Sequence, residues 1–394
     1  MYRRELCANV ESITSVHWER RLFDSLIPLP DGTSYNAYIV NGSEKTAIID
    51  SADPELKDEF FADLQGVEKV DYIISLHAEQ DHSGLIPELL EAYPEATLLC
   101  SDKAKDILIS HLCIAEDKIQ IVKDEEELSL GDLTLKFLYT PWVHWPETMC
   151  AYLVERKCLF SCDLFGSHLA TSELFATDKA KVYEAAKRYY SEIMMPFRTM
   201  IVRHLEKLSA YQIDLIAPSH GPAYNEPSFI VDAYKEWSSG KLDNKVIIPY
   251  ISMHGSTDKI VKYLADALVK EGVAVQLYEL TSTDIGYLAA DLISAATIVV
   301  ASPTVQLGPH PGVQYAVSLA NSLRPRAKYA AVLISYGWAT KALDQIAASI
   351  PNMKVEILGT LQHKGLPDAN AYAELDKLAA AIVKAHKEDD DVKC

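Results

Sequence analysis

The chain has 394 residues, enough for two domains, and its 49% apolar and 24% charged residues are ordinary for a globular protein. No apolar run approaches the roughly eighteen residues that cross a bilayer, and Met1–Cys7 is not followed by the apolar core of a signal peptide, so we expect a cytoplasmic protein with no membrane segment. A formal charge of −19 would repel nucleic acid and anionic lipid. It could favour a basic partner, or simply keep the surface soluble.

The cysteines do not form a recognisable site. They are scattered, odd in number and without a Cys-x-x-Cys pair, which argues against structural disulfides and against a zinc or rubredoxin-type iron site. We expect Cys158 and Cys162, which flank a strand, to act as small core residues.

The first fifty residues read as short extended runs. Asn41-Gly42 is a strong hairpin signal between Ser34–Val40 and Lys45–Asp50. We expect this hairpin to open a two-sheet sandwich with helices outside.

A dense cluster of potential metal ligands follows. The β-rich run Val70–Leu76 precedes His77-Ala78-Glu79-Gln80-Asp81-His82, and a helix is predicted to begin after Ser83-Gly84. Polar residues in a turn can simply be solvated, but two histidines and two carboxylates in six positions after a buried strand favour a site.

The rest of this half alternates between strands and helices. Strands are predicted at 96–100, 134–139 and 149–155, a hairpin at 127–133 with Gly-Asp at its turn, and helices at 86–93, 103–111 and within 178–209, broken at Pro196. Three further ligand candidates, His144, Asp163 and His220, lie at or after the ends of apparent strands, where a layered αβ fold gathers its site residues.

A small polar segment, Trp237–Asn244, marks a change of pattern, and we predict domains at 1–243 and 244–394. Beyond it, strands alternate regularly with helices, which predicts a doubly wound parallel sheet of flavodoxin type. The predicted strands are 245–250, 274–279, 297–301, 329–335 and 354–358, and the helices are about 259–271, 284–294, 312–322, 341–349 and 368–387.

Three loops at the carboxyl ends of strands one, three and four could together bind FMN. Hydroxyls and backbone amides of the first loop suit a single terminal phosphate at a helix N-terminus, and two aromatic rings offer faces for a flavin. Such residues can also be plain helix caps or packing, but the absence of GxGxxG disfavours a dinucleotide. The candidate residues are Ser252, Met253, His254, Gly255, Ser256, Thr257, Pro303, Thr304, Gln306, Gly308, Ser335, Tyr336, Gly337 and Trp338.

The ligand pattern resembles that of the metallo-β-lactamase superfamily, HxHxDH followed by His, Asp and His, with one departure. Glu79 stands where the second histidine is usual, and oxygen ligands suit iron or manganese better than zinc. HxExDH with these followers, fused to a flavodoxin-like half, is the pattern of the A-type flavodiiron proteins, a resemblance that covers the whole chain.

The resemblance implies a function and a ligand set. Flavodiiron proteins pass electrons through FMN to two non-haem irons and reduce dioxygen to water or nitric oxide to nitrous oxide. The family pattern implies that Asp163 bridges two irons; His77, Glu79 and His144 would complete the first site, and Asp81, His82 and His220 the second.

The resemblance also implies partners. A head-to-tail homodimer, or a dimer of dimers, would bring the flavin of one subunit to the irons of another. Because no rubredoxin-like or reductase extension follows Lys387, the donor is expected to be separate, either a rubredoxin-like protein or a reduced deazaflavin cofactor. His168 and Tyr190 are candidates for a position behind the ligands, whereas Asp24 departs from relatives that carry His near the metal pocket.

Two other classes remain open at this point. A zinc-dependent hydrolase of the metallo-β-lactamase type would use the same ligands, although Glu79 and the second domain argue against it. An electron carrier that uses only FMN would leave seven ordered ligand positions unexplained.

Overall fold

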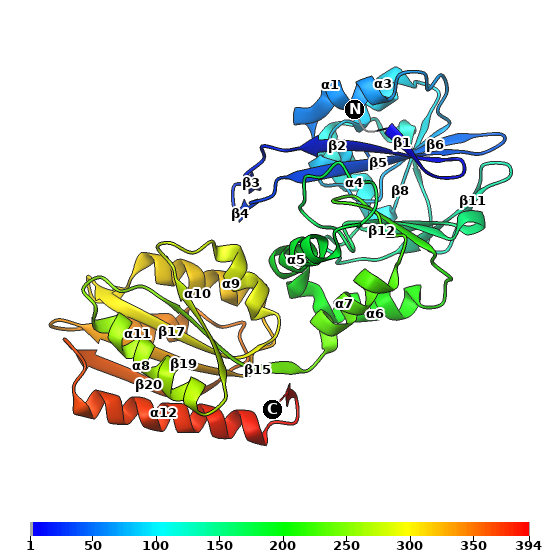
Figure 1. The fold of residues 1–394 in the computed structure, drawn as a ribbon. Coiled ribbons are helices and arrows are strands. Elements are labelled where there is room, and N and C mark those ends of the chain that lie inside the picture. Colours follow the sequence, from blue (N-terminus) through cyan, green and yellow to red (C-terminus); the bar gives the residue numbers. More distant parts are fainter. Residues whose placement is uncertain (1–2, 394) are drawn as a thin grey trace. The chain divides into compact units, whose positions relative to one another are not determined.

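The computed structural model describes residues 3–393 (Figure 1). These divide into two compact units, one containing residues up to Tyr190 and Phe197–Lys235, the other containing Ser191–Pro196 and the chain from Glu236 onward. The predicted boundary between residues 243 and 244 lies slightly further along, at the start of β15 (Leu242–Tyr250). Within residues 3–393, no helix combines the length and the apolar character that crossing a bilayer requires.

The first unit contains two sheets with helices outside them, as the sequence predicts. The seven-stranded sheet has the order β1 (Arg3–Cys7), β2 (Val10–His17), β5 (Thr33–Asn41), β6 (Thr46–Ile49), β7 (Tyr72–Ile74), β8 (Thr97–Cys100) and β9 (Ile119–Ile121). The five-stranded sheet has the order β10 (Glu127–Ser129), β11 (Thr134–Tyr139), β12 (Met149–Leu153), β13 (Cys158–Cys162) and β14 (Leu215–Pro218). A small separate sheet pairs β3 (Leu22–Phe23) with β4 (Ile27–Pro28).

Alternation along the strands builds two cores. Ile49 and Ile74 pack with Phe160 between the two sheets, whereas their neighbours Ile48 and Ile73 pack on the opposite face of the first sheet. That outer face is covered by α1 (Lys57–Asp63), α3 (Ile86–Ala92) and α4 (Asp102–Leu112), and the other long helices of the unit are α5 (Lys179–Tyr189), α6 (Arg198–Leu208) and α7 (Ser228–Ser239). The predicted hairpin is confirmed, because β5 and β6 pair antiparallel across Asn41-Gly42.

Cys158 and Cys162 are fully or almost fully buried in the core between the sheets, as predicted, and neither forms a disulfide. The strands before the His77 loop, Asp163 and His220 each have a parallel neighbour, since β7 pairs with β6 and β13 pairs with β14, whereas β11, before His144, pairs antiparallel with β10 and β12. Parallel strands end at the same edge of a sheet, so the residues after them converge.

The second unit is the predicted doubly wound sheet. Its five main strands are all parallel, in the order β16 (Ala274–Glu279), β15, β17 (Ala295–Val305), β19 (Tyr329–Tyr336) and β20 (Glu356–Lys364). The short strands β18 (Gly308–Pro309) and β21 (Val392–Lys393) pair with β17 and β15. The helices are α8 (Ser256–Lys270), α9 (Ile285–Leu292), α10 (Pro311–Leu323), α11 (Ala342–Ala348) and α12 (Ala369–Glu388), and α8 and α12 share one core on the same face of the sheet.

Two strands predicted in this unit are present but have different bounds. The fifth strand begins at Glu356 and continues to Lys364, because a bulge at Leu358, opposite the step from Ala330 to Ala331, leaves the ladder unbroken. The third strand continues past Ala301 to Val305, because it folds back on β18 as a hairpin.

Candidate metal centre

The His77 loop is tighter than the sequence predicts. A helical turn, α2 (Gln80–Ser83), already begins at Gln80, because the carbonyl of Glu79 accepts the amides of His82 and Ser83 at 3.0 and 2.9 Å. The Ser83 hydroxyl donates back to the carbonyls of Ala78 and Glu79, both at 2.9 Å. This short turn precedes the helix predicted after Ser83-Gly84, which is confirmed as α3, and Asp81 and His82 project from the turn.

One group of side chains converges around Glu79. Its Oε2 lies 3.1 Å from Nε2 of His77 and 3.1 Å from Nε2 of His144. The Oδ2 atom of Asp163 lies 3.5 and 3.2 Å from the same two nitrogens. The four side chains place their potential ligand atoms within 4.8 Å of one another.

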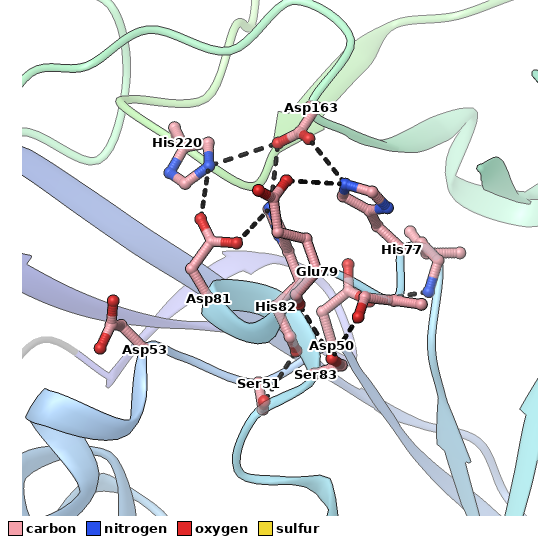
Figure 2. A network of polar contacts seen from close by, with 12 residues as sticks. Asp50, Ser51, Asp53, His77, Glu79, Asp81, His82, Ser83, Asp163 and His220 are labelled. Carbon is pink, nitrogen blue, oxygen red and sulfur yellow. Dashed lines mark hydrogen bonds and ion pairs between the residues drawn. The ribbon is translucent and has the colours of Figure 1, made fainter. Parts of the chain in front are cut away.

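A second group converges around Asp81 (Figure 2). Its two oxygens each lie 3.3 Å from a histidine, Oδ1 from Nε2 of His82 and Oδ2 from Nε2 of His220. The Oδ1 atom of Asp163 lies 3.1 and 3.3 Å from those nitrogens. The two carboxylate oxygens of Asp163 therefore face different groups: Oδ2 faces the group around Glu79, and Oδ1 faces the group around Asp81.

The pKa values reflect this crowding. Burial alone lowers the pKa of His77, but hydrogen bonds with Glu147 and Glu79 outweigh it and raise the pKa to about 10. Carboxylates outweigh burial in the same way at the other three imidazoles, giving a pKa of about 9 for His82, about 9 for His144 and about 10 for His220.

The donor set fits a pair of metal ions. Both oxygens of Asp81, Oδ1 of Asp163 and Nε2 of His82 are buried and make no hydrogen bond. Carboxylate oxygens and imidazole nitrogens that converge in one buried space are the ligands that a metal ion uses. Imidazoles mixed with several carboxylates suit iron or manganese, and a carboxylate with one oxygen toward each group can bridge two metals.

Contacts behind these residues were not anticipated from the sequence. His220 donates from Nδ1 to the carbonyl of Ser34 at 2.8 Å, and the Asn36 amide donates to the carbonyls of Pro218 and Gly221 at 2.9 and 2.7 Å. These bonds hold the loop after β14 against β5. The one sequence signal for these contacts was Asn36, a polar amide side chain within a predicted strand.

Two buried carboxyl groups were also missed. Glu147 accepts a hydrogen bond from Nδ1 of His77 at 2.6 Å, and this interaction outweighs burial and lowers the pKa of Glu147. Asp50, at the end of β6, accepts the amide of Leu76 at 2.7 Å, and burial raises its pKa to about 7. A carboxylate three residues after His144 was the available signal for Glu147.

The weaker candidates lie in different surroundings. The ring of His168 is 5.1 Å from that of His220, and its Nδ1 is 2.9 Å from the Thr33 hydroxyl. Tyr190 packs edge-to-face on Tyr234 at 5.1 Å. The pKa of Asp24 is raised by desolvation and by the negative charges of Glu79 and Asp81.

The predicted flavin loops lie at the carboxyl ends of their strands. After β15, the Ser252 hydroxyl accepts the amides of Gly255 and Asp258, both at 3.2 Å, and Ser256 and Thr257 lie in the first turn of α8 rather than before it. Thr257 and Ser335 are hydrogen-bonded through their hydroxyls at 2.8 Å, which joins the first loop to the end of β19.

The remaining flavin candidates flank that pair. Pro303 and Thr304 belong to β17, whereas Gln306 lies in the turn of the β17–β18 hairpin that Gly308 closes. Trp338 follows β19 with 73% of its surface exposed. A ring so exposed at the end of a central strand is available to a flat ligand.

The fold and site together define a metallo-β-lactamase-like domain joined to a flavodoxin-like unit. Residues 33–221 match the family described as ODP family beta lactamase. The chain is 32% identical to a nitric oxide reductase of Moorella thermoacetica over 88% of this chain and 89% of that one. It is 31% identical to the rubredoxin-oxygen oxidoreductase of Megalodesulfovibrio gigas over 95% and 96%.

The solved structures agree with the sequence relatives. The rubredoxin oxygen:oxidoreductase from the anaerobe Desulfovibrio gigas superposes with a TM-score of 0.93 at 29% identity, covering 97% of this chain and 98% of that one. The chain therefore belongs to the flavodiiron protein family, and the predicted fold class is confirmed.

Proposed function

We propose that this protein is a flavodiiron oxidoreductase that takes electrons from an external donor through FMN to a non-haem diiron site and reduces dioxygen, nitric oxide or both. The observation that carries the proposal is Asp163, which presents one oxygen to each of two His and carboxylate groups. Relatives named nitric oxide reductase and rubredoxin-oxygen oxidoreductase match both units, which supports the reaction class.

The proposed ligand assignment follows the two groups. His77, Glu79 and His144 would hold one iron, Asp81, His82 and His220 the other, and Asp163 would bridge them. The irons and FMN, when bound, supply electron transfer in single steps and a dimetal site for the gas. The protein holds most of the ligands in its interior: the side chains of His77 and Asp163 are at most 1% exposed, whereas those of His144 and Glu79 are 17% and 12% exposed.

The proposed flavin site uses the loops at the ends of β15, β17 and β19. The hydroxyls of Ser252, Ser256 and Thr257 and the start of α8 suit a phosphate, and Trp338 suits the ring system. The donor would be a rubredoxin-like protein or a reduced deazaflavin. A cytoplasmic location is part of this proposal.

Elemental analysis and anaerobic turnover test the proposal. Protein expressed with iron available should contain about two irons and one FMN per chain, and the reduced protein should consume dioxygen, nitric oxide or both. Mainly zinc in the site, with hydrolase activity, would overturn it in favour of a metallo-β-lactamase-type hydrolase. If FMN is reduced and reoxidised but neither gas is consumed, the protein is an electron carrier that uses only FMN.

We further propose a head-to-tail homodimer, or a dimer of dimers, in which one subunit's flavin serves another subunit's irons. The exposed apolar surface of Trp338 and Met253 at the flavin loops, 73% and 50% exposed, is suited to be covered by a second copy. Heterodimers of His144→Ala with a Ser256→Glu, Thr257→Glu variant should recover part of the activity, because one intact flavin then meets one intact metal site. Inactive verified heterodimers, or a fully active monomer, would rule this arrangement out.

A further inference from the structure

The His77 imidazole has a buried carboxylate behind it. Glu147 lies in the segment between β11 and β12, and its Oε1 accepts a hydrogen bond from Nδ1 of His77 at 2.6 Å. Both side chains are fully buried. An ionised carboxylate can only accept hydrogen bonds, so Nδ1 carries the proton and Nε2 is the nitrogen directed at Glu79 and Asp163.

Glu147 is itself held from two sides. Its Oε1 also accepts the amide of Ala78 at 3.1 Å, which connects it to the residue that follows His77. Its backbone carbonyl accepts the hydroxyl of Ser101, at the end of β8, at 2.6 Å. The ring of Trp145 packs edge-on against His77 at 5.1 Å. The Ala78 amide therefore fixes the carboxylate relative to the imidazole, whereas the Ser101 hydroxyl anchors only the backbone of Glu147.

The two groups of ligand candidates differ in this respect. His220, in the Asp81 group, donates from Nδ1 to the neutral carbonyl of Ser34 at 2.8 Å. A carboxylate partner polarises an imidazole more strongly than a carbonyl does and makes it a stronger metal donor. The two metal positions are consequently supported unequally.

We propose that Glu147 is a positioning residue that fixes the tautomer of His77 and strengthens its bond to the metal held with Glu79 and His144. This inference rests on the proposed diiron site. Carboxylates behind metal-bound histidines typically change metal affinity by about 10–100-fold. The effect is confined to one of the two metal positions, because Glu147 contacts the His77 end of the site.

Two substitutions and one control test the inference in the full-length protein. Glu147→Ala removes the acceptor, whereas Glu147→Gln keeps an acceptor oxygen for His77 without its charge. Release of iron to a chelator is measured at equilibrium, and Mössbauer spectra of the ⁵⁷Fe-loaded protein resolve the two irons. Glu147→Ala should weaken one iron by about 10–100-fold and change its spectrum alone, and Glu147→Gln should have a smaller effect in the same direction.

The matched control is Ser101→Ala, which removes the buried hydrogen bond to the Glu147 backbone and leaves the carboxylate in place. It should lower the thermal midpoint without changing iron affinity. Equal iron affinity in wild type and both Glu147 variants would overturn the inference, as would an equally weakened iron in Ser101→Ala. If Glu147→Ala does not fold, the Gln variant decides. A wild-type protein that binds no iron pair would instead refute the proposed function.

Discussion

Asp163→Asn tests the centre of the site most directly. The Asp163 side chain is 1% exposed and lies 3.1–3.5 Å from nitrogens of His77, His82, His144 and His220. Because the carboxylates raise the pKa values of these imidazoles to about 9–10, we expect them to be charged at pH 7 in protein stripped of metal. Asparagine removes the buried anion between them, and breaking a buried ion pair from one side costs about 3–5 kcal/mol.

The sign of this effect depends on pH. A raised histidine pKa stabilises the fold fully below the unfolded value of about 6.5 and loses that contribution as pH rises through about 9–10. Above that range the wild type keeps a buried Asp163 anion without cations. The difference in unfolding free energy between wild type and Asp163→Asn should therefore shrink or reverse by about pH 10.5.

Urea unfolding of the metal-free proteins at pH 7 and pH 10.5, followed by circular dichroism and tryptophan fluorescence, measures this difference. Trp145 reports on the site, because its ring packs on that of His77. The iron content of Asp163→Asn should fall while FMN is retained, since the proposed flavin loops belong to the other unit. An equal energy difference at both pH values, or unchanged iron content, would refute this reasoning.

Three further predictions follow from the same geometry. Ferrous iron binding at pH 7 should release close to four protons per chain, one from each charged imidazole, as measured by calorimetry in buffers of different ionisation enthalpy. Release of fewer than about two protons would contradict the charged state of the imidazoles. Asn36→Leu leaves the carbonyls of Pro218 and Gly221 with fewer hydrogen-bond donors, so the free energy of unfolding in urea should fall by about 1–3 kcal/mol and iron should bind more weakly. A variant as stable as the wild type would contradict this role of Asn36. Thr257→Asp puts a negative charge at the proposed phosphate position, which should repel the phosphate, so absorbance should show loss of FMN while iron is kept. If the variant still binds FMN, the phosphate does not bind at Thr257.

Features encoded over a few residues were predictable from the sequence. The hairpin at Asn41-Gly42 follows from turn chemistry, and the strand and helix alternation after residue 244 follows from apolar periodicity. The ligand cluster around His77 was visible because four candidate side chains occur within six residues. The lengths of β17 and β20 were not predictable, since they depend on pairing with other strands: β17 forms a hairpin with β18, and β20 pairs with β19 through a bulge.

Only the tertiary structure decided which atoms face one another. The sequence supplies Asp163 as one carboxylate after a strand, but the packing of two sheets turns one of its oxygens toward each group of histidines. Glu147 and His77 are separated by 70 residues, and they meet because the segment after β11 lies against the end of β7. No short stretch of sequence encodes a hydrogen bond between residues so far apart. The bond forms only after the strands between the two residues have paired, so neither periodicity nor turn residues could predict it.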